Sequence, residues 1–455
     1  MSPTPPFSSR PASPGDKRRA FLREISGLSM LGASGLTAGV TLAAPSPARA
    51  ALKTSAKIVV AGSGLGGLAV ASRLARELDG ASITIVDRKE VHNYQPGYTL
   101  VGTGIWPASK VSDRNADFIP AGADWVKAYV AEFDPVANTV TTDDGTKIRY
   151  DFLVVATGLQ LDYGRIEGMD TKAIGTNGLT SIYNGPEAAL ATWRTMDAFR
   201  GKGGEALLTL PATPLKCAGA PLKMTFMLAD RLNRAGTLDN SKITFHSALG
   251  NVFGVPAVNE TVLARWKTLG IDVAFSSQLA AIDIGARRAT FVSPEGERNE
   301  RPYDFIHVVP PMSAPDAVKK SELSWKEGGF AGGGWLEVDK DTLRHRRFPN
   351  VFGVGDINGT PRGKTAATVK KSAPIVAGNL IDTIAGRDPR QKFDGYTSCP
   401  LLLREGSALL IEFAYEGRLV PSLPGVDPLQ DSWFAWIMKT SLLKPAYMAV
   451  LKGRA

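Results

Sequence analysis

The two cysteines, Cys217 and Cys399, carry the most distinctive chemistry in this sequence, and they lie 182 positions apart. A thiolate can attack sulfur compounds, exchange with a disulfide or bind a metal. The spacing excludes a CxxC redox motif, and neither cysteine belongs to a CxxCH haem site or a cluster of metal ligands. Composition alone favours one structural disulfide as much as a redox pair. Context favours the redox pair, because each cysteine lies in a turn-like, proline-flanked segment that we expect near a bound cofactor.

The expectation of a cofactor comes from a glycine-rich segment. A strand-like run, a Gly-x-Gly-x-x-Gly loop, a helical pattern and a second strand-like run follow one another over residues 57–86. Gly62 permits the tight turn, Gly64 lets the backbone approach a pyrophosphate, and Gly67 lets the helix pack close to the strand. Asp87 ends the second strand and can accept hydrogen bonds from ribose hydroxyls. The pattern predicts a dinucleotide-binding domain.

Two later segments indicate FAD rather than NAD. One strand-like run ends in Ala156-Thr157-Gly158, and another ends in Gly355-Asp356. They resemble the ATG and GD segments of flavoproteins with two dinucleotide-binding domains, in which the acid at the position of Asp356 binds the ribityl chain.

A helix is predicted to begin close to the second of these segments, at Lys364 and Thr365. Its positive end would point to the flavin pyrimidine and stabilise the anionic reduced ring. We therefore include both residues among the expected cofactor-binding residues.

The loop before Cys217 lacks the second glycine fingerprint that such flavoproteins use for NAD(P)H. The strand-like run 206–210 is followed by Pro211-Ala-Thr-Pro214. The two prolines fix φ and remove two backbone N–H donors, so the loop is poorly suited to hold a pyrophosphate. We expect the second domain to keep its architecture without a nicotinamide site, and the electrons to come from a thiol.

Composition is ordinary for a globular protein, with 44% hydrophobic and 21% charged residues. The net charge is +9, of which residues 1–50 contribute +4, leaving +5 for the rest. That remainder is spread thinly and includes no dense basic run, which excludes a nucleic-acid partner.

The first fifty residues have the parts of a twin-arginine signal peptide in order. A polar start precedes the Lys-Arg-Arg-Ala-Phe-Leu run at 17–22, a weakly apolar segment follows, and Ala48-Arg49-Ala50 matches a cleavage site. The sequence therefore predicts a periplasmic mature protein that begins near Ala51. A disordered tail with a chance arginine pair is the alternative.

The C-terminal segment is aromatic and apolar, but Lys439, Lys444 and Pro445 interrupt it. It lacks the ~20 consecutive apolar residues of a spanning helix. We expect two short amphipathic helices, broken at Pro445, that dock on the membrane surface. The residues expected in the lipid interface are Trp433, Phe434, Trp436, Leu442, Leu443 and Tyr447. Packing on the protein's own core or a dimer contact is the alternative.

Several segments together resemble one family, the sulfide:quinone oxidoreductases, especially the branch with two redox cysteines. The resemblance covers nearly all of residues 55–440. It rests on the segments His92–Gly97, Tyr150–Asp162, Lys216–Pro221, His307–Ser313, Lys364–Ala367 and Tyr396–Leu401. The two cysteine segments are specific, whereas many flavoproteins share the glycine loop. Some relatives carry a third, upstream cysteine that this chain lacks, and twin-arginine export is not expected across that family.

The resemblance implies a FAD-dependent enzyme that passes electrons from sulfide to quinone. Cys217 and Cys399 would form a disulfide, with or without an extra sulfur between them. Attack by sulfide would leave a persulfide on Cys399 and a thiolate on Cys217, and the thiolate would reduce FAD. The sulfur acceptor and the oligomeric state, including a homo-oligomer, stay open.

Three other functions compete with this one. A flavoprotein subunit that passes sulfide electrons to cytochrome c is favoured by export but not by the apolar C-terminus. An NADH:quinone oxidoreductase is disfavoured by the proline loop. A sulfur-binding flavoprotein without turnover would bind polysulfide and leave its flavin oxidised.

The sequence predicts an α/β fold with two Rossmann-like dinucleotide-binding domains, the FAD domain being discontinuous, and a C-terminal membrane-docking region. The expected divisions are the signal peptide 1–50, the two parts of the FAD-binding domain at 51–162 and 301–390, the second Rossmann-like domain at 163–300, and the C-terminal region with Cys399 at 391–455.

Overall fold

The computed structural model describes residues 51–361, 363–423, 425 and 427–454. The expected signal peptide, residues 1–50, lies outside the described residues.

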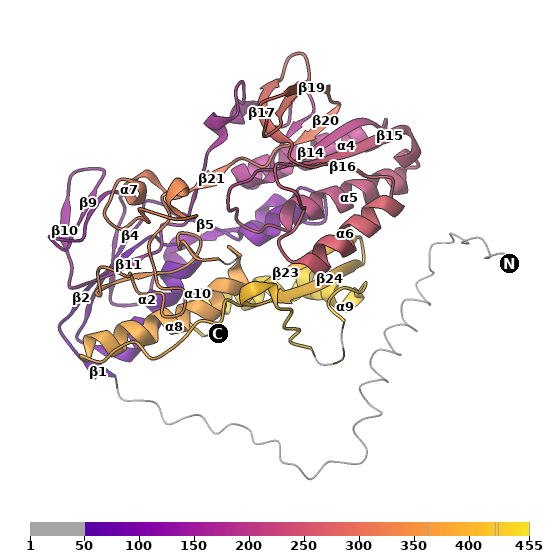
Figure 1. The fold of residues 1–455 in the computed structure, drawn as a ribbon. Coiled ribbons are helices and arrows are strands. Elements are labelled where there is room, and N and C mark those ends of the chain that lie inside the picture. The colour runs from indigo at the N-terminus through magenta and orange to yellow at the C-terminus, as the bar shows by residue number, and fades with distance from the viewer. Residues whose placement is uncertain (1–50, 362, 424, 426, 455) are drawn as a thin grey trace, which may run out of the picture. The chain divides into compact units, whose positions relative to one another are not determined.

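A five-stranded parallel sheet contains the glycine-rich segment (Figure 1). In spatial order its strands are β22 (Val351–Gly353), β11 (Phe152–Val155), β2 (Lys57–Ala61), β4 (Ser82–Val86) and β7 (Ala123–Val126). Short, buried, β-branched runs of this kind are typical of a parallel sheet covered on both faces. Helices α2 (Leu65–Glu77) and α8 (Ala366–Ile384) pack on each other beside it. Because β22 comes from much later in the chain than its neighbours, the sheet is built from two distant parts of the sequence.

A second five-stranded parallel sheet is formed by the middle of the chain. In spatial order its strands are β13 (Leu179–Thr180), β20 (Phe305–His307), β14 (Gly204–Leu210), β15 (Ser241–Ser247) and β16 (Asp272–Ala274). Its helices are α4 (Pro186–Arg200), α5 (Ala220–Ala235) and α6 (Pro256–Thr268). Two parallel, helix-covered sheets confirm the expected α/β class with Rossmann-like architecture.

Smaller elements form separate sheets and strand pairs. Antiparallel sheets are formed by β8 (Val130–Asp134), β9 (Thr139–Thr142) and β10 (Lys147–Arg149), and by β17 (Gln278–Asp283), β18 (Arg288–Val292) and β19 (Arg298–Pro302). Strand pairs are β1 (Leu52–Lys53) with β3 (Leu78–Asp79), β5 (Val91–Asn93) with β6 (Ser112–Arg114), and β12 (Gln160–Leu161) with β21 (Met312–Ser313). Short helices α3 (Tyr98–Val101) and α7 (Asp316–Lys319) lie in the connections.

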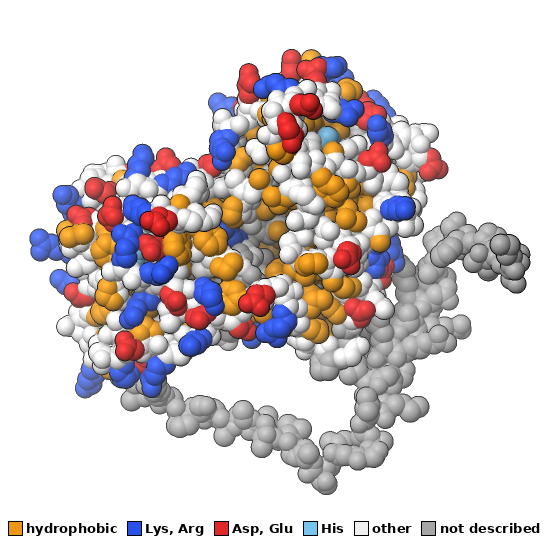
Figure 2. Space-filling model, viewed as in Figure 1, with side chains coloured by type: hydrophobic (Ala, Val, Ile, Leu, Met, Phe, Trp, Pro, Cys, Tyr) orange, Lys and Arg blue, Asp and Glu red, His pale blue; other side chains and the backbone are white. Residues whose placement is uncertain are grey.

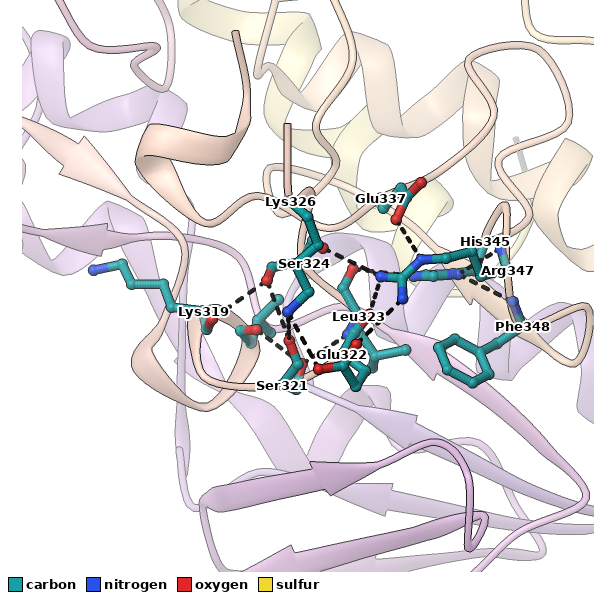
Figure 3. Close-up of polar contacts among 11 residues, drawn as sticks. Lys319, Ser321, Glu322, Leu323, Ser324, Lys326, Glu337, His345, Arg347 and Phe348 are labelled. Carbon is teal, nitrogen blue, oxygen red and sulfur yellow. Dashed lines mark hydrogen bonds and ion pairs between the residues drawn. The ribbon is translucent and has the colours of Figure 1, made fainter. Parts of the chain in front are cut away.

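The connection that leads into β22 is held by a polar cluster around Arg347 and His345 (Figure 3). Arg347 Nε donates to Glu337 at 2.8 Å, and its other nitrogens reach Glu322 and the backbone of Ser324. The buried His345 ring accepts from the backbone N–H groups of Arg347 and Phe348, at 3.1 and 3.2 Å. Burial lowers the pKa of His345 to about 4, so the ring is neutral and stabilises this connection.

The C-terminal part forms a hairpin, β23 (Thr397–Arg404) with β24 (Ser407–Phe413), followed by a helical run. The run consists of α9 (Trp433–Ile437), a π-helical turn at Met438–Leu442 and α10 (Leu443–Leu451). The expected break at Pro445 is therefore wrong, since Pro445 lies inside α10. The first turn of α10, which contains Pro445, directly follows the π-helical turn, in which the ordinary i→i−4 hydrogen-bond pattern is already interrupted.

The helical run is anchored on α2 rather than lying free. Ser72 Oγ donates to Leu451 O at 2.9 Å, and the guanidinium of Arg76 donates to Lys452 O at 2.8 Å. Within the described residues, no helix has both the length and the apolar character that crossing a bilayer requires. Figure 2 shows a hollow near the centre of the viewed face, with hydrophobic side chains along much of its rim.

Candidate functional site

The glycine loop after β2 has the packing that a dinucleotide site requires. Gly62 has φ +116°, and a Cβ atom there would lie 2.4 Å from Ala156 O. A Cβ atom on Gly67 would lie 1.9 Å from Gly62 O, so the start of α2 can approach the strand only because this residue is glycine. Gly64 faces open space, and no atom of the described residues lies within 4 Å of its Cβ position. Gly64 is thus where a pyrophosphate can approach the backbone.

Asp87 is buried beside this loop, and the protein already uses most of its acceptor capacity. One carboxylate oxygen, Oδ2, accepts from Ser63 N at 2.8 Å and Ser63 Oγ at 2.9 Å. The other, Oδ1, accepts from Lys89 N at 3.0 Å. A carboxylate has about four acceptor positions, so one remains on Oδ1 for a ribose hydroxyl.

The expected flavin-binding segment Ala156-Thr157-Gly158 follows the end of β11, next to the glycine loop. Ala156 is the residue that Gly62 contacts, and Gly158 has φ +70°. The Oγ1 atom of Thr157 is buried and has no hydrogen-bond partner among the described residues. An unpaired buried hydroxyl costs free energy, so this atom fits a site that is completed by a bound cofactor.

Asp356 and Lys364 lie together at the end of β22. Lys364 Nζ donates to the backbone oxygens of Asp356 at 2.6 Å and Asn358 at 2.9 Å, and lies 3.8 Å from the ring centroid of Trp335. Burial lowers the pKa of Lys364 to about 8. Thr365 caps α8 by accepting from Thr368 N at 3.1 Å. The helix start therefore lies where it was predicted, and the Lys364 side chain holds the Asp356 loop.

The two cysteines are brought together. Their Sγ atoms lie 4.0 Å apart as free thiols. Cys217 has φ +53°, unusual for a residue with a side chain, and strain of this kind is often found at functional sites. Its backbone N–H donates to Lys364 O at 2.8 Å, which ties the cysteine loop to the start of α8.

Cys399 approaches Cys217 from β23, so the expected turn around Cys399 is wrong. It is 4% exposed and lies against Gly219, the residue before α5. A Cβ atom on Gly219 would lie 2.3 Å from the Cys399 sulfur, so only glycine leaves room for this sulfur. The N-terminus of α5, which would face a pyrophosphate in a nucleotide-binding domain, therefore faces sulfur.

The surroundings of the pair favour a thiolate on Cys217. The hydrogen bond from the Cys399 thiol and the ammonium group of Lys223, 3.4 Å away, hold the pKa of Cys217 well below its ordinary value. The same hydrogen bond, together with burial, raises the pKa of Cys399. Burial alone would lower the pKa of Lys223, but the two cysteine sulfurs raise it. The arrangement thus favours a thiolate on Cys217 and a protonated thiol on Cys399.

Two further residues beside the cysteines were missed as site residues. Lys439 lies in the π-helical turn and is 3% exposed, and its Nζ donates to Pro96 O at 2.6 Å. Burial and the nearby Lys223 lower its pKa to about 7. Tyr183 is buried, and its hydroxyl has no hydrogen-bond partner among the described residues. Burial raises the pKa of Tyr183, and the cysteine sulfurs raise it further.

A signal for one of these residues was present in the sequence. Lysine inside the apolar C-terminal segment indicates either a headgroup contact or a buried partner, and only the fold decides between them. Tyr183 carries no comparable signal, because its burial depends on contacts between distant segments.

Comparison with known proteins finds related sequences and a related fold. The model of the pyridine nucleotide-disulphide oxidoreductase family matches residues 56–186. A mitochondrial sulfide:quinone oxidoreductase of Dictyostelium discoideum is 39% identical over 89% of this chain and 87% of its own length. The mitochondrial enzyme of Mus musculus is 34% identical over 87% of this chain and 86% of its own length.

The fold is also that of a solved structure. The sulfide:quinone oxidoreductase from Aquifex aeolicus matches with a TM-score of 0.72 and 21% identity, covering 89% of this chain and 92% of that chain. At this identity the match shows the fold alone.

These relatives correct one prediction and establish the family. The expected periplasmic location is contradicted, because the two relatives at 39% and 34% identity are both named as mitochondrial proteins. Identity at this level over most of both chains shows that the protein belongs to the sulfide:quinone oxidoreductases, a family of FAD-dependent oxidoreductases.

Proposed function

We propose that this protein oxidises sulfide through a relay between Cys217 and Cys399 and transfers the electrons through FAD to a quinone. The observation that carries the proposal is the 4.0 Å contact between the two sulfurs, with Lys223 against one of them. The proposal keeps the domain division expected from the sequence and the cofactor-binding residues placed around Gly64, Asp87 and Asp356.

The relay begins from a disulfide between Cys217 and Cys399. Hydrosulfide attacks the Cys399 sulfur, a new S–S bond forms there, and the electron pair of the broken bond leaves on Cys217. An acceptor nucleophile then removes the outer sulfur and leaves a second thiolate on Cys399. FAD, when bound, supplies the two-electron acceptor for the return of the two thiolates to the disulfide and passes the electrons to quinone.

The direction of attack follows from the charges around the pair. The better leaving group is the sulfur with the lower thiol pKa, and Lys223 Nζ, 3.4 Å from Cys217 Sγ, stabilises a thiolate that leaves on Cys217. Attack on Cys399 therefore expels the favoured thiolate. A sulfur atom inserted between the cysteines requires the two Sγ atoms to approach from 4.0 Å, because two S–S bonds of ~2.05 Å that meet at a bent sulfur span less than their sum.

The proposed quinone route uses the C-terminal helical run as a membrane contact. Trp433, Phe434 and Leu442 are 40%, 40% and 50% exposed, an arrangement that suits insertion into a lipid interface. Trp436 and Tyr447 are buried, so the expectation that these two lie in lipid is wrong. Replacing these three residues by serine should weaken membrane association in a vesicle-binding assay while the packing of α10 on α2 stays intact.

Anaerobic titration of the purified protein tests the function. Sulfide is expected to bleach the flavin absorbance, and a short-chain quinone to restore it. Bleaching by NADH instead would favour an NADH:quinone oxidoreductase. Restoration by cytochrome c but not by quinone would favour the cytochrome-linked function. Binding of polysulfide without any bleaching would leave only a sulfur-binding protein.

A further inference from the structure

A continuous chain of buried hydrogen bonds connects the C-terminal helix to the acid beside the glycine loop. Tyr447 Oη lies 2.8 Å from His92 Nε2, and His92 Nδ1 lies 3.1 Å from Asn115 Oδ1. Asn115 Nδ2 donates to Ser63 Oγ at 2.6 Å, and Ser63 Oγ donates to Asp87 Oδ2 at 2.9 Å. All five side chains are less than 9% exposed. The chain joins parts of the sequence as much as 355 residues apart.

The donors and acceptors in this chain have one consistent direction. The amide nitrogen of Asn115 uses both hydrogens, one on Ser63 and one on Lys89 O at 3.0 Å, so its oxygen must accept. His92 Nδ1 is therefore protonated and donates to that oxygen. Burial lowers the pKa of His92, which keeps the ring neutral. His92 Nε2 then accepts, and Tyr447 must be the donor.

The end of the chain bears on the cofactor. Ser63 has one hydroxyl proton, and because Asn115 donates to its oxygen, that proton is directed to Asp87. Asp87 is thereby fixed through Oδ2, which leaves the free acceptor position on Oδ1. Without the Asn115 contact, the Ser63 hydroxyl can turn away, and the carboxylate loses one of the three hydrogen bonds that orient it.

We propose that Tyr447, His92 and Asn115 are positioning residues that orient Ser63 and Asp87 for the ribose of FAD, so that the C-terminal helix holds the cofactor in place. None of the three needs to touch FAD. The helix acts through the hydroxyl proton of Tyr447, which reaches His92 only when α10 is packed in place. A membrane-docking role of the same segment leaves this one unchanged, since the exposed residues and Tyr447 are different.

The chain offers a matched control for the helix itself. Ser72 Oγ donates to Leu451 O and anchors the same helix without belonging to the hydrogen-bond chain. Tyr447→Phe removes the donor and keeps the ring, which packs edge-on against Tyr94 at 4.9 Å. Ser72→Ala removes an anchor and leaves the donor. If α10 contributes only packing, the two variants behave alike.

The test measures FAD release from oxidised holoprotein, by the rise of flavin fluorescence after dilution, with no sulfide or quinone present. We expect Tyr447→Phe to release FAD about fivefold faster, the factor that corresponds to one buried hydrogen bond of ~1 kcal/mol. Ser72→Ala is expected to release FAD at nearly the wild-type rate. Equal rates for Tyr447→Phe and wild type, or an equal increase in both variants, would overturn the proposal.

A second measurement keeps the test decisive if Tyr447→Phe does not fold. Ser63→Ala removes the last hydroxyl of the chain and leaves the backbone bond from Ser63 N to Asp87. Ser63→Ala alone is expected to speed release about fivefold or more. Where Tyr447→Phe also folds, the double variant should be no faster than Ser63→Ala alone. Wild-type release from Ser63→Ala, or additive effects in the double variant, would contradict a chain. Since no sulfide is used, failure of the cysteine relay would not affect these results.

Discussion

The two parallel sheets position a helix N-terminus at their sites in the same way, but the loops before the two helices consist of different residues. In each, a central strand, β2 or β14, is followed by a loop and a helix whose N-terminus faces the site. After β2 the loop consists of glycines, and Gly64 is open to a phosphate. After β14 the loop contains prolines and ends at Cys217. One helix N-terminus is thus suited to a pyrophosphate and the other to a thiolate.

The space in front of each helix explains the difference. Nothing lies within 4 Å of the Cβ position of Gly64, whereas that of Gly219 would lie 2.3 Å from the Cys399 sulfur. Pro211 and Pro214 also lack the N–H groups that a phosphate loop uses. The architecture therefore does not determine the ligand, and a few loop residues do.

The largest expected effect is the loss of sulfide-driven flavin reduction when either cysteine is replaced. Cys217→Ser and Cys399→Ser each remove one half of the relay, so sulfide-driven flavin bleaching should fall by about 10³-fold or more. Stopped-flow absorbance under anaerobic conditions measures this rate. FAD content should match the wild type, because neither thiol is part of the glycine loop. Normal bleaching in both variants would refute the relay.

The next prediction concerns FAD affinity and the glycine loop after β2. Gly62→Ala places a methyl group 2.4 Å from Ala156 O at a positive φ, so the loop must shift, and FAD affinity should fall by about a hundredfold or more. Equilibrium dialysis of the apoprotein with FAD measures the affinity. Gly64→Ala is the control for folding, since its Cβ meets no protein atom. An apoprotein melting temperature unchanged in Gly62→Ala would contradict the packing explanation.

A smaller effect is expected where the helix meets sulfur. Gly219→Ala has no backbone strain but crowds the Cys399 sulfur, so sulfide-driven reduction should slow by about tenfold while FAD stays bound. Gly164→Ala, at an open position, is the matched control. Wild-type reduction rates in Gly219→Ala would show that the position of Cys399 is not critical.

The smallest effect concerns the charge on Cys217. In the reduced protein, Lys223 and the Cys399 thiol lower the pKa of Cys217, so its thiolate forms at lower pH than an ordinary cysteine. Lys223→Met removes one of these two stabilising groups, and the titration of thiolate absorbance should move to higher pH. Lys439→Met should move it less, because Lys439 Nζ contacts Pro96 O rather than a sulfur. A shift to lower pH in Lys223→Met would contradict this account.

Local sequence predicted the cofactor side well. The runs Lys57–Ala61 and Ser82–Val86 are strands at the two ends of the pattern predicted over residues 57–86, and α8 begins next to Thr365. These elements are determined by short-range patterns: buried β-branched residues, turn glycines and a threonine cap.

The sulfur side depends on contacts that short-range patterns do not contain. Pro400 made a turn around Cys399 the natural prediction, yet among the described residues β23 pairs only with β24, and an edge strand tolerates proline. Tyr447 was assigned to lipid because it lies in an apolar segment, but its hydroxyl is bound by His92, 355 residues earlier. Burial of that kind is a property of the tertiary fold.

The most direct test of the relay is an inventory of sulfur on the two cysteines. The protein is mixed anaerobically with one equivalent of sulfide and no quinone, alkylated, digested and analysed by mass spectrometry. The account predicts one added sulfur atom on the peptide that contains Cys399, and none on that peptide in Cys217→Ser. No added sulfur on the Cys399 peptide, or added sulfur on the Cys217 peptide alone, would contradict it.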